Sequence, residues 1–117
     1  MSRSGALEAV ERVLNRGGDP TEVLRATVAV LHERLDRFVR VSFVAGDRLE
    51  PGPAAGDEAP VSAFPIVWEG MRAAELEVSG ELQAADRELL GRVATLVSPY
   101  VRPAPGKGAT RPPSMPD

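Results

Sequence analysis

The sequence has no cysteine and a single histidine in 117 residues. Without cysteine the chain can form no disulfide, no thiolate nucleophile and no cysteine-based zinc or iron–sulfur site. The histidine, His32, falls on the polar side of a predicted helix, so we expect neither a metal site nor proton transfer there. We predict no metal, no cofactor and no catalytic residue.

The chain also lacks long apolar runs and an excess of positive charge. No stretch approaches 18 apolar residues, and the first residues have no apolar segment typical of a signal peptide. We therefore expect a cytoplasmic protein that does not associate with membranes. The net charge is −3, which argues against a nucleic-acid partner, because binding to a phosphate backbone needs a basic surface.

Hydrophobic periodicity divides the chain into helices and strands around one core. It predicts helices over residues 5–16, 20–35 and 84–100, a first strand over 38–45 and a hairpin over 61–78. Residues 48–60 contain three prolines, so we expect one short edge strand at most, followed by loop. The predicted fold class is α+β, a small antiparallel sheet with all the helices on one face. Residues 1–4 are predicted to be flexible, 5–100 to form the domain, and 101–117, with five prolines, to be disordered.

A two-residue turn at Glu69 and Gly70 fixes the predicted register of the hairpin. An uninterrupted ladder pairs Trp68 with Met71, Ile66 with Ala73, and Phe64 with Glu75. Side chains then alternate between the two faces. The face expected against the helices carries Val61, Ala63, Pro65, Val67, Ala74, Leu76 and Val78.

The opposite face of this hairpin combines large apolar groups near the turn with Glu75 and Glu77 at the far end. If the first strand lies beside the returning strand, Arg40 and Ser42 adjoin the glutamates. Two glutamates on one face could form an acid/base pair, but the simpler interpretation is a solvated face on which Arg40 pairs with a glutamate. The residues predicted to form a face for a partner or ligand are Phe64, Ile66, Trp68, Met71, Arg40 and Glu75.

The apolar part of that predicted face needs a cover, because soluble monomers rarely expose a patch of this kind. Residues 45–60 could fold over it. Otherwise a second chain or a small apolar ligand covers it.

Several of these patterns resemble the GAF domain, a small sensory module of bacterial signalling proteins. The resemblance rests on Phe64-Pro65-Ile66, the turn at Glu69-Gly70, the strand ending Leu76-Glu77-Val78, and the helix "LQAADRELLGRVATLV". It extends over about residues 5–100. The family usually places helices and loops that roof a ligand pocket between the second strand and the final hairpin. Here that region is only residues 45–60, so the resemblance implies a shortened, stand-alone domain.

The resemblance implies a non-enzymatic regulatory or sensory module. Known ligands of the family are cyclic nucleotides, tetrapyrroles and small metabolites, but a covalently attached tetrapyrrole and the reduction of free methionine sulfoxide both depend on cysteine. We expect the chain to act by protein–protein interaction, as a homodimer or with another signalling protein. The alternative is a small-molecule sensor with a compact pocket on the sheet face opposite the helices.

Overall fold

The computed structural model describes residues 3–101, and within them the predicted order of helices and strands is confirmed. Residues 1–2 and 102–117, which include nearly all of the predicted tail, lie outside the described residues. Val101, which the sequence assigned to the tail, is instead buried in the core. The elements are α1 (Arg3–Arg16), α2 (Pro20–Leu35), β1 (Val39–Ala45), β2 (Arg48–Ala55), β3 (Val61–Trp68), β4 (Met71–Ser79), α3 (Ala84–Val97) and the 3₁₀ turn η1 (Ser98–Tyr100).

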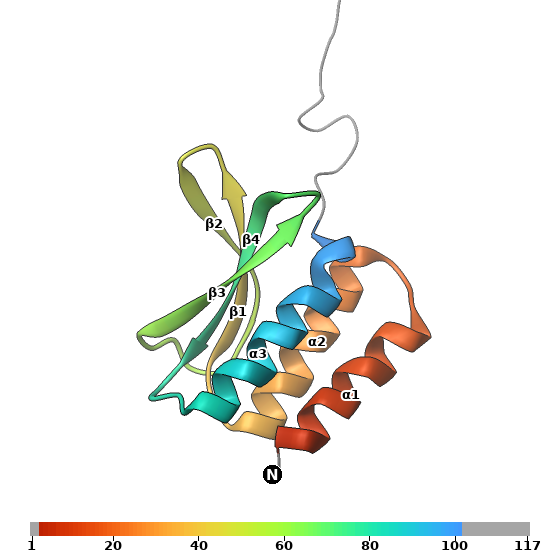
Figure 1. Ribbon diagram of the computed structural model, residues 1–117, viewed down its shortest axis with the longest axis vertical. Helices are drawn as coiled ribbons and strands as arrows, with labels where there is room; N and C mark the ends of the chain where they lie inside the picture. Colours follow the sequence, from red (N-terminus) through yellow and green to blue (C-terminus); the bar gives the residue numbers. More distant parts are fainter. Residues whose placement is uncertain (1–2, 102–117) are drawn as a thin grey trace, which may run out of the picture.

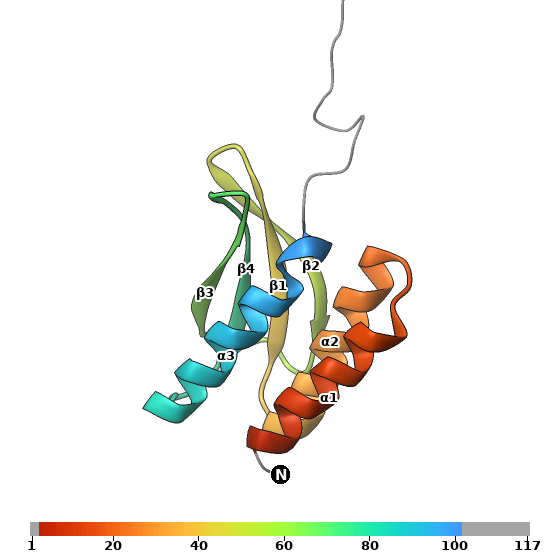
Figure 2. The same cartoon turned by 45° about the vertical axis from the view of Figure 1, so that its right-hand side comes forward.

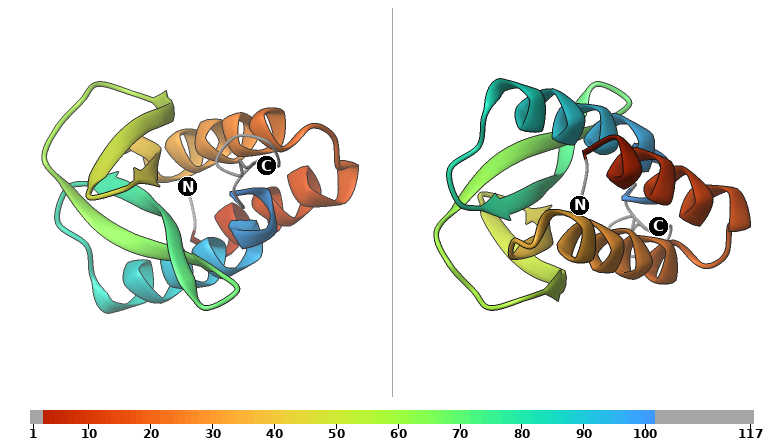
Figure 3. Two further views of the ribbon diagram at one scale, coloured as in Figure 1. Left: turned by 90° about the horizontal axis from the view of Figure 1, so that it is seen from above. Right: turned by 90° about the horizontal axis from the view of Figure 1, so that it is seen from below.

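The four strands form one antiparallel sheet in the order β2-β1-β4-β3, and the three helices lie on one of its faces (Figure 1). Helix α2 packs against β1 and β2, and α3 packs against β3 and β4. Helix α1 packs on α2 and α3, as the turned view shows (Figure 2). Seen along the sheet from above and below, helices and strands form two separate layers (Figure 3). The predicted α+β arrangement is confirmed.

Local signals set the helix boundaries. Asp19 caps α2 by accepting a hydrogen bond from the backbone N–H of Thr21 at 3.1 Å, and Pro20 occupies the first turn, where proline is favoured. The helix ends at Asp36, whose φ of 57° is left-handed. Helix α1 begins at Arg3, two residues before the predicted start. Pro99 lies in η1, where α3 has already ended, which agrees with the poor fit of proline in a helix interior.

The core lies between the sheet and the helices. Each element contributes its regularly spaced apolar side chains, as amphipathic helices and half-buried strands do. The fully buried members with the largest volumes are Leu24, Leu31, Ile66, Leu76, Leu90, Val10, Val23, Val28, Val39, Val41, Val78 and Val93.

Strand β2 is longer than predicted. It runs for eight residues although it contains Pro51 and Pro53, and it pairs with β1 from Arg48 to Ala55. A proline removes a backbone donor, which an outer strand tolerates because only one of its edges is paired. The sequence prediction of a short strand followed by loop was therefore wrong in length, although the edge position is correct.

The register of the hairpin from β3 to β4 is the main correction to the prediction. The pairs Trp68–Met71 and Val67–Arg72 form beside the turn, as the uninterrupted ladder predicted. The ladder then shifts by one residue, so that Ile66 pairs with Ala74 instead of Ala73. A β-bulge of this kind places one extra residue on one strand, here Ala73 on β4.

The bulge reverses the faces of β3 relative to β4. Phe64 pairs with Leu76 instead of Glu75, and Ile66 lies in the core with no exposed surface. Ala63, Pro65 and Val67, which the sequence placed against the helices, lie on the opposite face. A shift of one residue exchanges the two faces of a strand, because side chains alternate with a period of two. The predicted positions of Ala74, Leu76 and Val78 against the helices are confirmed.

Candidate functional site

We call the side of the sheet opposite the helices the open face. The register places on it alternate residues of all four strands. Its members are Arg40, Ser42 and Val44 of β1, Leu49, Pro51 and Ala54 of β2, Ala63, Pro65 and Val67 of β3, and Arg72, Glu75 and Glu77 of β4.

The residues predicted to form a partner or ligand face do not share one surface. Arg40 and Glu75 lie on the open face as expected. Ile66 is fully buried on the helix side, and Phe64 packs partly buried against the same core. Trp68 is half-buried at the hairpin turn, and Met71 opposite it is 73% exposed. The predicted apolar patch is therefore divided between the core and the turn.

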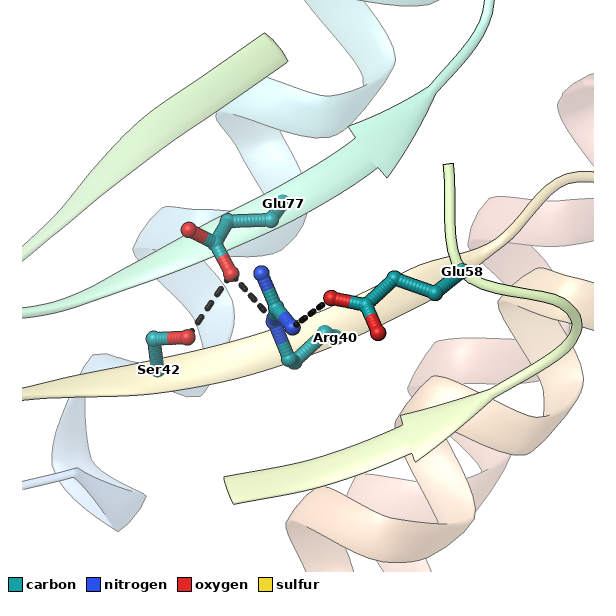
Figure 4. Close-up of polar contacts among 4 residues, drawn as sticks. All are labelled: Arg40, Ser42, Glu58 and Glu77. Atoms are coloured by element: carbon teal, nitrogen blue, oxygen red, sulfur yellow. Dashed lines mark hydrogen bonds and ion pairs between the residues drawn. The ribbon is translucent and has the colours of Figure 1, made fainter. Parts of the chain in front are cut away.

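An ion pair between Arg40 and Glu77 occupies the centre of the open face (Figure 4). Arg40 Nε donates to Glu77 Oε1 at 2.6 Å, and the Ser42 hydroxyl donates to the same oxygen at 2.7 Å. The Arg40 guanidinium also lies 5.3 Å from the ring centroid of Phe38, close enough for a cation–π contact. The sequence predicted that Arg40 pairs with a glutamate, and this is confirmed.

The environment of Arg40 fixes its charge. The hydrogen bond with Glu77 raises the pKa of the Arg40 guanidinium, burial lowers it, and the bond with Glu58 raises it further. The net shift is upward from an already basic value, so Arg40 is a permanent cation at physiological pH.

Glu75 pairs with Arg72 and not with Arg40, the arginine predicted to adjoin the glutamates. Its carboxylate oxygen Oε2 lies 3.0 Å from Arg72 Nη1, three residues away along β4. Both glutamates are buried and each is paired with an arginine, Glu75 with Arg72 and Glu77 with Arg40. The polar centre of the open face therefore satisfies its own charges.

Residues 56–60 cover one end of the open face. They connect β2 to β3, the two outer strands, so they must cross the sheet. Arg40 Nη1 donates to Glu58 Oε2 at 3.1 Å, which places the crossing on the open face. Gly56, at the start of the crossing, lies beside the buried Phe38. The idea that residues 45–60 fold over the sheet thus holds for this end only, because residues 48–55 form β2.

Small apolar side chains flank the charged centre on both outer strands. On β3, Ala63 and Pro65 are exposed and Val67 is 46% exposed. On β2, Ala54 and Pro51 are exposed and Leu49 is 41% exposed. The sequence prediction missed these residues as surface candidates. For the residues on β3, the signal that could have found them was the unfavourable exposure of Phe64 and Ile66 that the predicted register required.

His32 has a structural role. Its ring Nδ1 lies 2.8 Å from the carbonyl oxygen of Arg37, to which it must donate, and the ring packs where a Cβ on Gly56 would sit. The side chain thus joins the end of α2 to the residues that follow β2. Among residues 3–101, no group of three or more histidine, aspartate or glutamate side chains is placed to hold a metal ion.

Comparisons with known proteins identify the fold. No protein-family model matches the sequence, and no curated protein is similar to it in sequence. The structure is similar to the crystal structure of the GAF domain from Acinetobacter phosphoenolpyruvate-protein phosphotransferase, with a TM-score of 0.72 and 9% identity. The match covers 95% of this chain and 99% of the Acinetobacter domain. No helix among residues 3–101 is both long and apolar enough to cross a bilayer. The resemblance noted in the sequence is thus confirmed at the level of structure, and the chain has the fold of a GAF domain.

Proposed function

We propose that this chain is a non-enzymatic regulatory module of a bacterial cytoplasmic signalling system, and that it acts by binding protein through its open face. The GAF-like fold supports a regulatory or sensory role in general. The observation that carries the proposal is the composition of the face, in which paired charges are bordered on both sides by exposed apolar residues.

The paired charges favour a protein partner because they need nothing from outside. Arg40 and Ser42 both donate to Glu77, and the two glutamates are already largely removed from water. A partner that covers the face therefore adds little desolvation, whereas burying an unpaired charge is strongly unfavourable. Exposed Val67 and Leu49 then supply apolar area to the contact.

The same pairs argue against catalysis by the two glutamates. A general base needs an accessible carboxylate within hydrogen-bonding reach of a substrate proton. Glu77 already accepts from Arg40 and Ser42 while only 6% exposed, and Glu75 is bound to Arg72. We therefore assign both glutamates a structural role.

A photo-crosslinking experiment tests the proposed function. The full chain carries p-benzoylphenylalanine at Val67, on the open face, or at Ala29, which is exposed on α2 in the other layer. Irradiation in the cells that produce the protein should give a discrete adduct from position 67 and none from position 29. If position 67 yields no adduct, or the same adducts as position 29, the open face is not a protein-binding surface.

A second candidate function is binding of a small anionic molecule at Arg40. The Nε of Arg40 is paired with the buried carboxylate of Glu77. Its Nη1 is paired with Glu58, whose side chain is 74% exposed. An exposed ion pair contributes little and can be exchanged. A ligand carboxylate or phosphate could therefore take the place of Glu58.

Acetate and inorganic phosphate are suitable probes for this second candidate. We expect either anion to shift the Arg40 Nε–H resonance saturably, and more strongly after Glu58→Gln removes the competing charge. A linear response that is equal in the two proteins would mean that no anion site exists.

A further inference from the structure

We propose that residues 102–105 bind back onto Trp68 and Met71 at the end of the sheet, so that the C-terminal segment is a ligand of its own domain. This inference is independent of the proposed function, because it concerns the side of the sheet that carries the helices. It rests on the apolar surface beside the hairpin turn, on the place where the chain leaves the core, and on the sequence of residues 102–105.

Trp68 and Met71 form an apolar surface that we call the turn patch. Ile66 is buried on the helix side, Trp68 follows it by two residues along β3, and Met71 pairs with Trp68 across the hairpin. Side chains alternate along a strand and paired residues share a face, so all three lie on the helix side. Trp68 is nevertheless only half-buried and Met71 is 73% exposed. The helices therefore leave this end of the sheet incompletely covered.

The chain emerges from the core at the same end of the molecule. Helix α3 and strand β3 run in the same direction, and η1, which follows α3, packs against β3 (Figure 1). Figure 2 also shows η1 and the turn between β3 and β4 at one end of the molecule. Val101 is 4% exposed, and its backbone N–H donates to the carbonyl oxygen of Ser98 at 3.2 Å. The buried Val101 thus fixes the starting point of residue 102 on the side of the turn patch.

The sequence of residues 102–105, Arg-Pro-Ala-Pro, favours an extended segment. Proline fixes its own φ at about −65° and disfavours the helical conformation in the residue before it. Arg102 and Ala104 each precede a proline, so all four residues are restricted to extended or polyproline conformations. Such a segment spans about 12 Å, which exceeds the spacing of about 4.8 Å between the two strands of the turn patch. A segment restricted in this way also loses little conformational entropy when it binds.

The residue types of the segment match those of the turn patch. Grooves that bind polyproline segments are lined with aromatic side chains, and Trp68 is the only tryptophan of the chain. An arginine guanidinium binds well over a tryptophan ring, and Arg102 begins the segment. Glu69, exposed in the turn next to Trp68, supplies an opposite charge. We expect both prolines of the segment to pack on the ring and Arg102 to pair with Glu69.

The distribution of charge along the chain favours the same contact. Residues 102–117 contain two arginines, one lysine and one aspartate, a net charge of +2. Residues 3–101 contain 11 arginines, no lysine and 16 acidic residues, a net charge of −5. A positive segment is attracted to a negative domain, and its covalent attachment gives it an effective concentration of about millimolar or more at the patch. Even a weak contact is therefore populated.

The fluorescence of Trp68 provides a direct test, because no other tryptophan contributes to the signal. We would compare the natural chain with Pro103→Ser/Pro105→Ser, and use Pro112→Ser/Pro113→Ser as the matched control. We expect the first variant to shift the Trp68 emission to longer wavelength and to raise its quenching by acrylamide roughly twofold, because water and quencher then reach the ring. The control should behave as the natural chain does.

Nuclear magnetic resonance gives a second measurement on the same three proteins. The chain has a single indole N–H, that of Trp68, so its resonance needs no further assignment. We expect this resonance to move in Pro103→Ser/Pro105→Ser and to keep its position in the control. Circular dichroism checks that all three proteins have the same fold.

Each other result overturns the proposal. Unchanged emission, quenching and indole resonance in Pro103→Ser/Pro105→Ser would mean that residues 102–105 do not cover Trp68. Equal changes in the two variants would mean that the contact does not belong to residues 102–105. Quenching of the natural chain that rises on dilution would show that a second copy covers the turn patch. None of these results affects the adduct at position 67, which tests the open face separately.

Discussion

The two faces of the sheet differ in what satisfies their side chains. Toward the helices, Ile66, Leu76 and Val41 are buried against apolar neighbours, as in any protein core. On the open face, buried carboxylates are neutralised by arginines of the same sheet, and apolar residues remain exposed at the edges. The first face supplies stability, whereas the second is complete in its polar contacts and still has apolar area to bury.

The largest expected effect comes from changing which residues belong to which face. Because Ala73 is the extra residue of the bulge, its deletion leaves Ala74 opposite Ile66 and keeps both faces intact. Deleting Glu75 instead shifts the rest of β4 by one residue and turns its apolar side chains toward solvent. We expect the Ala73 deletion to unfold cooperatively in urea and the Glu75 deletion to show no cooperative transition. If the outcomes are reversed, the ladder has no bulge at Ala73.

Ile66 and Val67 are adjacent on β3 and point to opposite faces of the sheet, so substituting each one compares how much the two faces contribute to stability. Ile66→Ala removes a fully buried side chain and should lower the free energy of unfolding by about 2–5 kcal/mol. Val67→Ala changes a side chain that is 46% exposed and should change it by about 0.5 kcal/mol or less. Urea denaturation measures both. A larger loss of unfolding free energy for Val67→Ala than for Ile66→Ala would indicate that the uninterrupted register is the correct one.

The two carboxylates bound by Arg40 test the charged centre of the open face. Glu77→Ala leaves the half-buried Arg40 and the buried Ser42 without their shared acceptor, so we expect a loss of about 1–3 kcal/mol. Glu58→Ala removes only an exposed pair and should cost about 0.5 kcal/mol or less. Thermal unfolding of both variants, and of the double variant, gives the coupling. Equal losses of unfolding free energy for Glu77→Ala and Glu58→Ala would mean that the burial of Glu77 does not strengthen its pair with Arg40.

Much of the fold could be predicted from the sequence because its strongest signals are local. Asp19 with Pro20 marked the start of α2, and Glu69 with Gly70 marked the hairpin turn. The similarity to GAF domains, together with the charge pattern, placed Arg40 beside the acidic end of β4, and Glu77 is its partner there.

The candidate face could not be predicted correctly, because a bulge leaves little trace in composition. Counting outward from the turn gives the right pairs only as far as Val67, and beyond Ala73 every predicted pair is displaced by one. The wrong register could have been recognised from the residues that it exposed. It exposed Phe64 and Ile66 while burying Pro65, and an exposed apolar patch that needs a cover can indicate that the assumed register is wrong.

The prolines of the two outer strands have a consequence for how copies can assemble. Pro51 and Pro53 lie in β2 and Pro65 in β3, so a strand arriving at either edge of the sheet meets residues that cannot donate a backbone hydrogen bond. Lateral growth of the sheet from molecule to molecule is thereby discouraged.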